Sequence, residues 1–273
     1  MERKDFEILI DRKLITQIGY VEDMLNNPDK LEQLSLENMA AEGVLSQPEI
    51  NVAVIESGVD VLVPILTQSD LMERIKSGKS IKLTNDIQLD TCIVLDKGDK
   101  CDIDLNGYTI TAGLFKENNG ELLDGDSDSY VFWNKGGELA ISGDGNIISQ
   151  PASYSIAVWT QAGITIINDG TYENFGEGSD LIYASGTGTI TINGGYYKAC
   201  VKQEGVDGTK NKRAALNVKD ADYKKGTAQI IVNGGKFLEF DPANNVSEGP
   251  NTNFVTDGYT TVFDKDIYSV IKA

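Results

Sequence analysis

The sequence predicts an all-β protein built as a β-solenoid, with a short α-helical region at its N-terminus. A motif of alternating apolar residues, one polar residue and glycine recurs five times. The two shortest intervals between its polar residues are 26 and 25 residues, and the repeat consists of strand and turn residues without helix. A turn of this length cannot bury its apolar face alone, so successive turns are expected to stack about 4.8 Å apart around one core.

The five copies of the repeat are defined by their polar residues, Asn106, Ser142, Asn168, Asn193 and Asn233. Apolar residues three and one positions before each polar residue are expected to point inward. A second inward row is expected four positions after it, at Ile110, Tyr172, Tyr197 and Phe237. The glycine after each asparagine is expected to adopt the positive φ of a tight corner. Thr165 stands where other copies have Ile or Leu, which predicts a bulge. Longer intervals predict extra loops near residues 113–130 and 202–226.

Residues 1–43 read as a helical attachment or oligomerisation segment. Spacings of four, four, three and four place one apolar stripe on a helix: Ile10, Leu14, Ile18, Val21 and Leu25. Helices this short need a partner surface, either a sister subunit or another protein. Residues 44–68 are predicted to be a connecting β segment. Residues 69–240 are predicted to be the β-helix, opened by a helix over Leu71–Lys76 with Ser69-Asp70 as its cap, and 241–273 a C-terminal β cap. The cap is expected to end in a hairpin, Thr260–Phe263 with Asp266–Ile271.

The charge and composition exclude several function classes. The chain has 42 acidic and 24 basic residues, a formal charge of −18 and no histidine. A Ser-His-Asp triad and a His-ligated zinc site are therefore impossible, and nucleic acid is not an expected partner. No signal peptide begins the sequence and no segment is apolar enough to span a membrane. The three cysteines lack metal-ligand spacing and are expected to be small buried hydrophobes, with a pairing of Cys92 and Cys101 across a turn as the alternative.

The sequence also resembles a known family. Ile81–Ile87 and Ile103–Ile110 resemble the opening turns of pectin-lyase-like right-handed parallel β-helices. Residues 241–245 and 248–255 resemble the closing segment of β-helix proteins from gut bacteria and their phages. With its helical N-terminus, the chain is similar to head fibres of crAss-like bacteriophages. This resemblance implies a structural virion protein, made in the host cytoplasm without a signal peptide. It implies capsid or other virion proteins as partners, a homo-oligomer (trimer or dimer), and contact with host glycans.

The resemblance does not carry over a catalytic site. Pectin hydrolases of this fold use a Gly-His-Gly motif, which a chain without histidine lacks, and Arg74-Ile75-Lys76 lies upstream of the repeats. Lyases of this fold use an arginine base, and Arg213 alone lies within the repeat region. No catalytic residue, cofactor or enzymatic activity is therefore predicted. A tailspike-like polysaccharide depolymerase (lyase or glycosidase) and a non-catalytic glycan-binding adhesin remain as alternatives.

Aromatic residues supply the candidate glycan-binding site. Tyr196 has outward parity next to inward Tyr197, and Trp159 and Tyr183 come from neighbouring turns. A calcium loop begins at Asp124, Asp126 and Asp128, but its later positions do not fit, so no metal site is predicted. A third of the basic residues lie in 198–225, which reads equally as a contact for an acidic partner or as a solvated mixed-charge loop.

Overall fold

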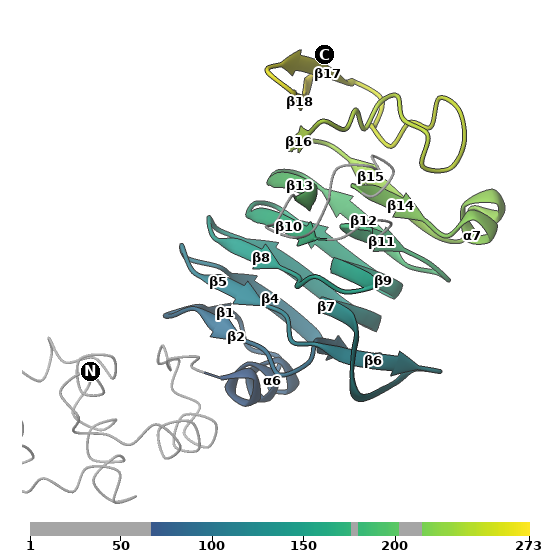
Figure 1. Ribbon diagram of the computed structural model, residues 1–273. Helices are drawn as coiled ribbons and strands as arrows, with labels where there is room; N and C mark the ends of the chain where they lie inside the picture. Colours follow the sequence, from purple (N-terminus) through teal and green to yellow (C-terminus); the bar gives the residue numbers. More distant parts are fainter. Residues whose placement is uncertain (1–66, 176–179, 202–214) are drawn as a thin grey trace, which may run out of the picture. The chain divides into compact units, whose positions relative to one another are not determined.

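The structure is a computed structural model that describes residues 67–175, 180–201 and 215–273, without the side chains of Cys200 and Val201. The chain divides into two units, Met1–Ile65 and Leu66–Ala273, and the described residues belong to the second (Figure 1). The predicted apolar stripe from Ile10 to Leu25 and the connecting segment 44–66 lie outside the described residues. All described helices and strands belong to the second unit.

The second unit is mostly β-strand, arranged in two sheets whose pairings are largely parallel (Figure 1). The ten-stranded sheet contains β1 (Ile81–Lys82), β3 (Ile93–Leu95), β4 (Lys100–Asp104), β6 (Phe115–Asn118), β7 (Glu121–Ser142), β9 (Tyr154–Ile167), β11 (Ile182–Ala184), β12 (Thr189–Ile192), β14 (Leu216–Val218) and β15 (Gln229–Val232). The eight-stranded sheet contains β2 (Ile87–Gln88), β5 (Thr109–Thr111), β8 (Asn146–Ile148), β10 (Thr171–Phe175), β13 (Tyr196–Val201), β16 (Lys236–Leu238), β17 (Tyr259–Asp264) and β18 (Ile267–Lys272). The described part of this unit also has two helices, α6 (Gln68–Lys76) and α7 (Asp220–Lys225). The all-β prediction is confirmed.

Four of the five repeat copies pair in the predicted register. β12 lies between β9 and β15, so that Ile192 stands between Ile167 and Val232, and all three side chains are buried. These inward positions form a continuous row because parallel strands stack equivalent residues of successive copies.

The first copy is displaced by two residues. Asp104, not Asn106, lies opposite Ser142. Asn106 instead has a φ of 49° at the corner, and its Nδ2 donates a hydrogen bond to Leu83 O over 2.9 Å. The corner of this copy is therefore longer, and the alignment of Asn106 with the later polar residues is wrong.

The second inward row holds the four predicted residues and also Ile147, which lies five rather than four positions after Ser142. Ile110, Ile147, Tyr172, Tyr197 and Phe237 lie side by side on β5, β8, β10, β13 and β16, and each is fully buried. The last three form what we call the interior ring ladder. Its ring centroids are 5.0 and 4.7 Å apart, with planes within 13° of parallel. Parallel stacking follows from placing equal side chains one strand apart.

Two glycines differ from the prediction. In the Gly-Gly pairs that follow Asn193 and Asn233, the second glycine has the positive φ, 95° at Gly195 and 103° at Gly235. A Cβ on the first glycine would overlap a backbone carbonyl of the preceding copy, Asn168 O for Gly194. The first glycine is therefore required by close backbone approach rather than by its own φ.

Thr165 causes no bulge. The register between β7 and β9 shifts near Lys135 instead. The side chain of Thr165 is fully buried, with its Oγ1 2.7 Å from Thr160 Oγ1 and 3.3 Å from Asn134 Nδ2. A threonine thus occupies an apolar position without strain, because its hydroxyl finds partners inside.

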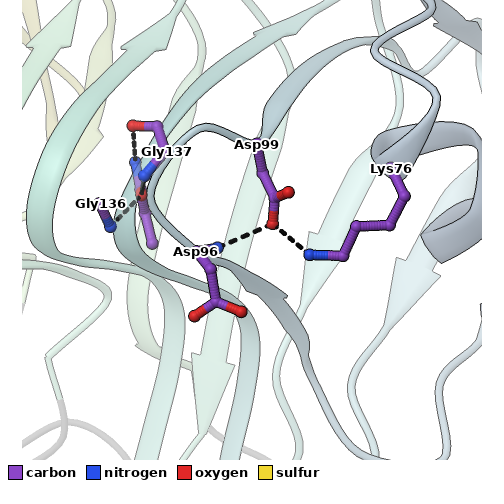
Figure 2. A network of polar contacts seen from close by, with 6 residues as sticks. Lys76, Asp96, Asp99, Gly136 and Gly137 are labelled. Atoms are coloured by element: carbon purple, nitrogen blue, oxygen red, sulfur yellow. Dashed lines mark hydrogen bonds and ion pairs between the residues drawn. The ribbon is translucent and has the colours of Figure 1, made fainter.

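Helix α6 covers the first strands (Figure 1). The helix is confirmed, but its cap is Thr67 rather than Ser69: Thr67 and Asp70 form a capping box, and Leu71 is buried. At its end, Lys76 Nζ donates to Asp99, which also accepts from the Asp96 amide (Figure 2). Burial alone raises the pKa of Asp99, but the Lys76 and Asp96 contacts outweigh it and the pKa is lowered.

The other end of the unit is the predicted hairpin. β17 pairs antiparallel with β18, and β18 pairs antiparallel with β16 (Figure 1). The first extra loop folds into an antiparallel pair of β6 with the start of β7. The second contains α7, while its residues 202–214 lie outside the described part. Cys92 and Cys101 are buried free thiols, as the simpler reading predicts, and Cys200 is not described.

Candidate functional site

The three aromatic candidates lie on two different sheets. Tyr196 belongs to β13 in the eight-stranded sheet, whereas Trp159 and Tyr183 belong to β9 and β11 in the ten-stranded sheet. They therefore cannot form one sugar platform, and each surface has to be judged by its own contacts.

Trp159 and Tyr183 belong to an outer aromatic stack, which we define as Trp133, Trp159 and Tyr183. These residues are paired in register, and the residues before and after each of them are fully buried. The two indoles are 4.7 Å apart and nearly parallel, and Trp159 lies 5.9 Å from Tyr183. Trp159 Nε1 donates to Ser185 Oγ over 2.9 Å. Because neighbouring rings lie on both sides of Trp159, its role is packing, and it has little ring face left for a ligand.

The first extra loop covers one end of this stack. Phe115 and Tyr130 meet edge to face at 5.1 Å, and Tyr130 meets both indoles in the same way. Cys92 and Ile156 complete this buried cluster. Lys135 Nζ lies 4.8 Å from the Trp133 ring. Trp133 is consequently buried although it points away from the main core.

Tyr183 ends the stack, since the next copy has Asn217 at this position. Burial raises the pKa of Tyr183 to about 12, and so do the nearby carboxylates, in decreasing order of effect Asp180, Asp222, Glu248 and Asp220. Asn217 Oδ1 is buried without a hydrogen-bond partner among the described residues. This end of the stack is therefore acidic.

Tyr196 lies in a groove of about 410 Å³ on the eight-stranded sheet. The groove runs along the corners that precede β8, β10, β13 and β16 and reaches β18. Its lining residues are Asp144, Gly145, Asp169, Gly170, Thr171, Gly194, Gly195, Tyr196, Gly235, Lys236, Ser269, Val270 and Ile271. The corner glycines immediately before β10, β13 and β16 accept backbone hydrogen bonds of 2.8 to 2.9 Å from the next copy or from the hairpin. A ligand here can approach the backbone closely because these corners carry no side chains.

The Tyr196 side chain stands in the middle of the groove. It is half-buried and paired with Thr171 on one side and Lys236 on the other. Lys198 Nζ lies 5.1 Å from the ring and also donates to Glu173 over 2.6 Å. Lys198 is thereby held on the sheet beside the ring, outside the residues that line the groove.

Two aspartates line one end of the groove. Asp144 and Asp169 each lie two residues before a paired position, Asn146 and Thr171, so both stand at corners that precede adjacent strands, and the corner of Asp144 is one residue longer. Both are exposed. Sequence reasoning missed them, although a signal was present. Each aspartate directly precedes a corner glycine, and the two later copies have glycine in place of the aspartate.

The interior ring ladder supports the groove from beneath. Tyr172 Oη donates to Asp169 O over 2.9 Å, and Tyr197 Oη donates to Gly194 O over 2.8 Å. Burial raises the pKa of both phenols well above the ordinary value, so both remain neutral donors. The position of the groove wall therefore depends on core residues.

The acidic loop has no metal-binding geometry. Asp128 is buried and its Oδ2 accepts from Glu117 N at 2.6 Å and Ser127 Oγ at 2.9 Å, while Asp124 and Asp126 are exposed on β7. In the described ranges no three His, Cys, Asp or Glu side chains come together as metal ligands. Nor is any described helix long and apolar enough to cross a membrane. Compared with known proteins, the chain matches no family model, no curated protein and no solved structure.

Proposed function

We propose that this chain is a non-enzymatic structural protein of a bacteriophage virion, a head fibre or capsid decoration, that binds surface glycans in the Tyr196 groove. The observation that carries the glycan part is the groove itself. It places an aromatic ring between hydroxyl, carboxylate and amino groups across five neighbouring strands. Sugars need this combination, because they present apolar C–H faces together with hydroxyls that donate and accept hydrogen bonds.

The proposal includes a right-handed parallel β-helix as the projecting part of the fibre. The parallel pairing of equivalent residues in successive copies supports it. Right-handedness follows the general preference of connections between parallel strands. A stacked β core is stiff, and the net charge of −18 keeps neighbouring copies apart.

The virion part of the proposal rests on the sequence resemblance and on the apolar stripe of residues 1–43. The stripe would attach the chain to the capsid, to another virion protein or to sister subunits in a trimer or dimer. Changing Leu14 and Ile18 to Asp in the full-length chain should abolish incorporation into particles without unfolding the β domain. Normal incorporation of that variant, quantified in purified particles, would show that the stripe is not the anchor.

Glycan binding is tested by a matched pair of tyrosine variants. Tyr196→Ala should abolish binding on a glycan array, since it removes the ring from the groove. Tyr183→Ala is the control, because it removes the same side chain from the other sheet and should leave binding unchanged. If Tyr183→Ala abolishes binding and Tyr196→Ala does not, the site is the outer aromatic stack and the groove assignment is wrong.

Polysaccharide cleavage is a second candidate, favoured by the presence of two carboxylates in one groove, Asp144 and Asp169. Glycosidases use two carboxyls about 5–5.5 Å or about 6.5–9.5 Å apart. Incubation with host capsule and measurement of new reducing ends separates the two functions. If the wild-type protein forms products and Asp169→Asn does not, the function of the groove is hydrolysis rather than binding.

A further inference from the structure

We propose that the groove selects glycans by charge: it binds a chain that presents an amino sugar to Asp144 and Asp169, and it rejects polyuronates. This inference rests on the glycan-binding function proposed above. It goes beyond that function by naming the class of glycan and the end of the groove that recognises it.

The two aspartates create a local negative site. Both side chains line the same end of the groove, at the corners that precede two adjacent strands, β8 and β10. Neither carboxylate forms an ion pair with a described residue. Asp169 Oδ1 accepts from Gly170 N, which fixes the side chain at the corner. An ammonium group bound at this end of the groove gains an ion pair with each carboxylate.

The cationic groups near the groove do not neutralise this pair. Lys198 is held by Glu173, with an Nζ–Oε1 distance of 2.6 Å. Lys236 lies two strands beyond Asp169, about 10 Å away along the stack. One end of the groove is therefore acidic and the other carries a single amine, which gives a bound chain a preferred direction.

The size of the groove indicates an oligosaccharide rather than a single sugar. From β8 to β18 it crosses four strand spacings, about 19 Å. Tyr196 lies at the middle of this length, so a chain that reaches the aspartates also passes the ring. A polyuronate of this length would bring several carboxylates into an acidic groove on a protein of charge −18.

The experiment uses the full-length protein and three tetrasaccharides, of glucosamine, glucose (cellotetraose) and galacturonic acid, in isothermal titration calorimetry. A mildly acidic buffer keeps the amines of the glucosamine chain protonated. The glucosamine chain should bind about tenfold more tightly than cellotetraose, as two exposed ion pairs allow, and the galacturonate chain should bind most weakly. The advantage of the glucosamine chain should fall as salt is added.

Variants identify the residues responsible. Asp144→Asn with Asp169→Asn should remove the preference for glucosamine, so that the glucosamine chain and cellotetraose bind with equal affinity. The control, Asp124→Asn with Asp126→Asn, makes the same change in net charge at exposed positions outside the groove and should keep the preference. Charge selection is wrong if the first variant keeps the preference for glucosamine, or if the galacturonate chain binds most tightly. In either case the glycan-binding function is still supported. If none of the three chains binds, both proposals fail.

Discussion

Two adjacent tyrosines of β13 should have opposite importance for stability and for binding. Tyr197 belongs to the interior ring ladder and is fully buried between Tyr172 and Phe237 at 5.0 and 4.7 Å. Replacing such a ring by alanine costs about 3–5 kcal/mol of unfolding free energy, because a cavity replaces the packed atoms. The contacts on both ring faces place Tyr197→Ala near the upper end of that range.

The phenol hydroxyl accounts for a smaller share. Tyr197 Oη donates to Gly194 O over 2.8 Å, and loss of one such hydrogen bond costs about 1 kcal/mol. Tyr197→Phe therefore separates the hydroxyl from the ring, which should account for the remaining ~3–4 kcal/mol. Tyr196→Ala, next along the strand and half-buried, should cost no more than ~1 kcal/mol.

Equilibrium urea unfolding, followed by tryptophan fluorescence, measures these free energies. Tyr196→Ala should bind no glycan yet unfold near the wild-type midpoint, whereas Tyr197→Ala should show a large shift of that midpoint. The reasoning is refuted if the two variants lose equal stability, or if Tyr197→Ala loses less than ~1 kcal/mol. Either result would mean that the assignment of inward and outward faces on β13 is wrong.

Three further predictions concern alkaline pH, thiol reactivity and the surface amides. The tyrosines of the interior ring ladder have folded-state pKa values above the unfolded value of 10.0, so the folded protein holds protons that the unfolded chain releases. Stability should therefore be intact below pH ~10 and fall as the pH rises above it, with tyrosinate absorbance appearing only on unfolding. Burial raises the pKa of Cys92 to about 12, although Lys135 acts against it, and burial raises the pKa of Cys101 as well. Neither thiol should therefore react with a thiol reagent until urea unfolds the protein. Asn193 donates to Asn168 Oδ1 and accepts from Asn233 Nδ2, so Asn193→Ala removes two hydrogen bonds. In urea unfolding, Asn193→Ala should therefore lower the unfolding free energy by up to ~1 kcal/mol more than Asn233→Ala does. Equal losses in the two variants would show that the amide row contributes nothing.

The inward rows could be predicted from sequence because they depend on local rules. Side chains alternate along a strand, so Ile190 and Ile192 read as inward from their own neighbours. Equivalent residues of later copies then had to stack, and Tyr197 with Phe237 does so. The same alternation separated Tyr196 from Tyr197 correctly.

The pairing register of the first copy could not be predicted in this way. The corner of this copy is two residues longer than those after Asn168, Asn193 and Asn233, which leaves the alternation intact but changes which residue lies one strand away, so Asp104 takes the place assigned to Asn106. The role of Trp159 was missed for a related reason. Its outward parity is visible in the sequence, but the rings that cover it, Trp133 and Tyr183, depend on pairing across copies.

The sequence by itself determined the class of fold, the inward rows and the outward direction of Tyr196, since all of these follow from periodicity and the shape of a strand. Only the tertiary structure decided where a ligand can lie. The groove joins Asp144 to Ile271, residues far apart in the chain that meet because parallel copies stack and the terminal hairpin pairs back onto β16. Hydrogen bonding between strands sets that neighbourhood, and the local pattern of apolar and polar residues does not encode it.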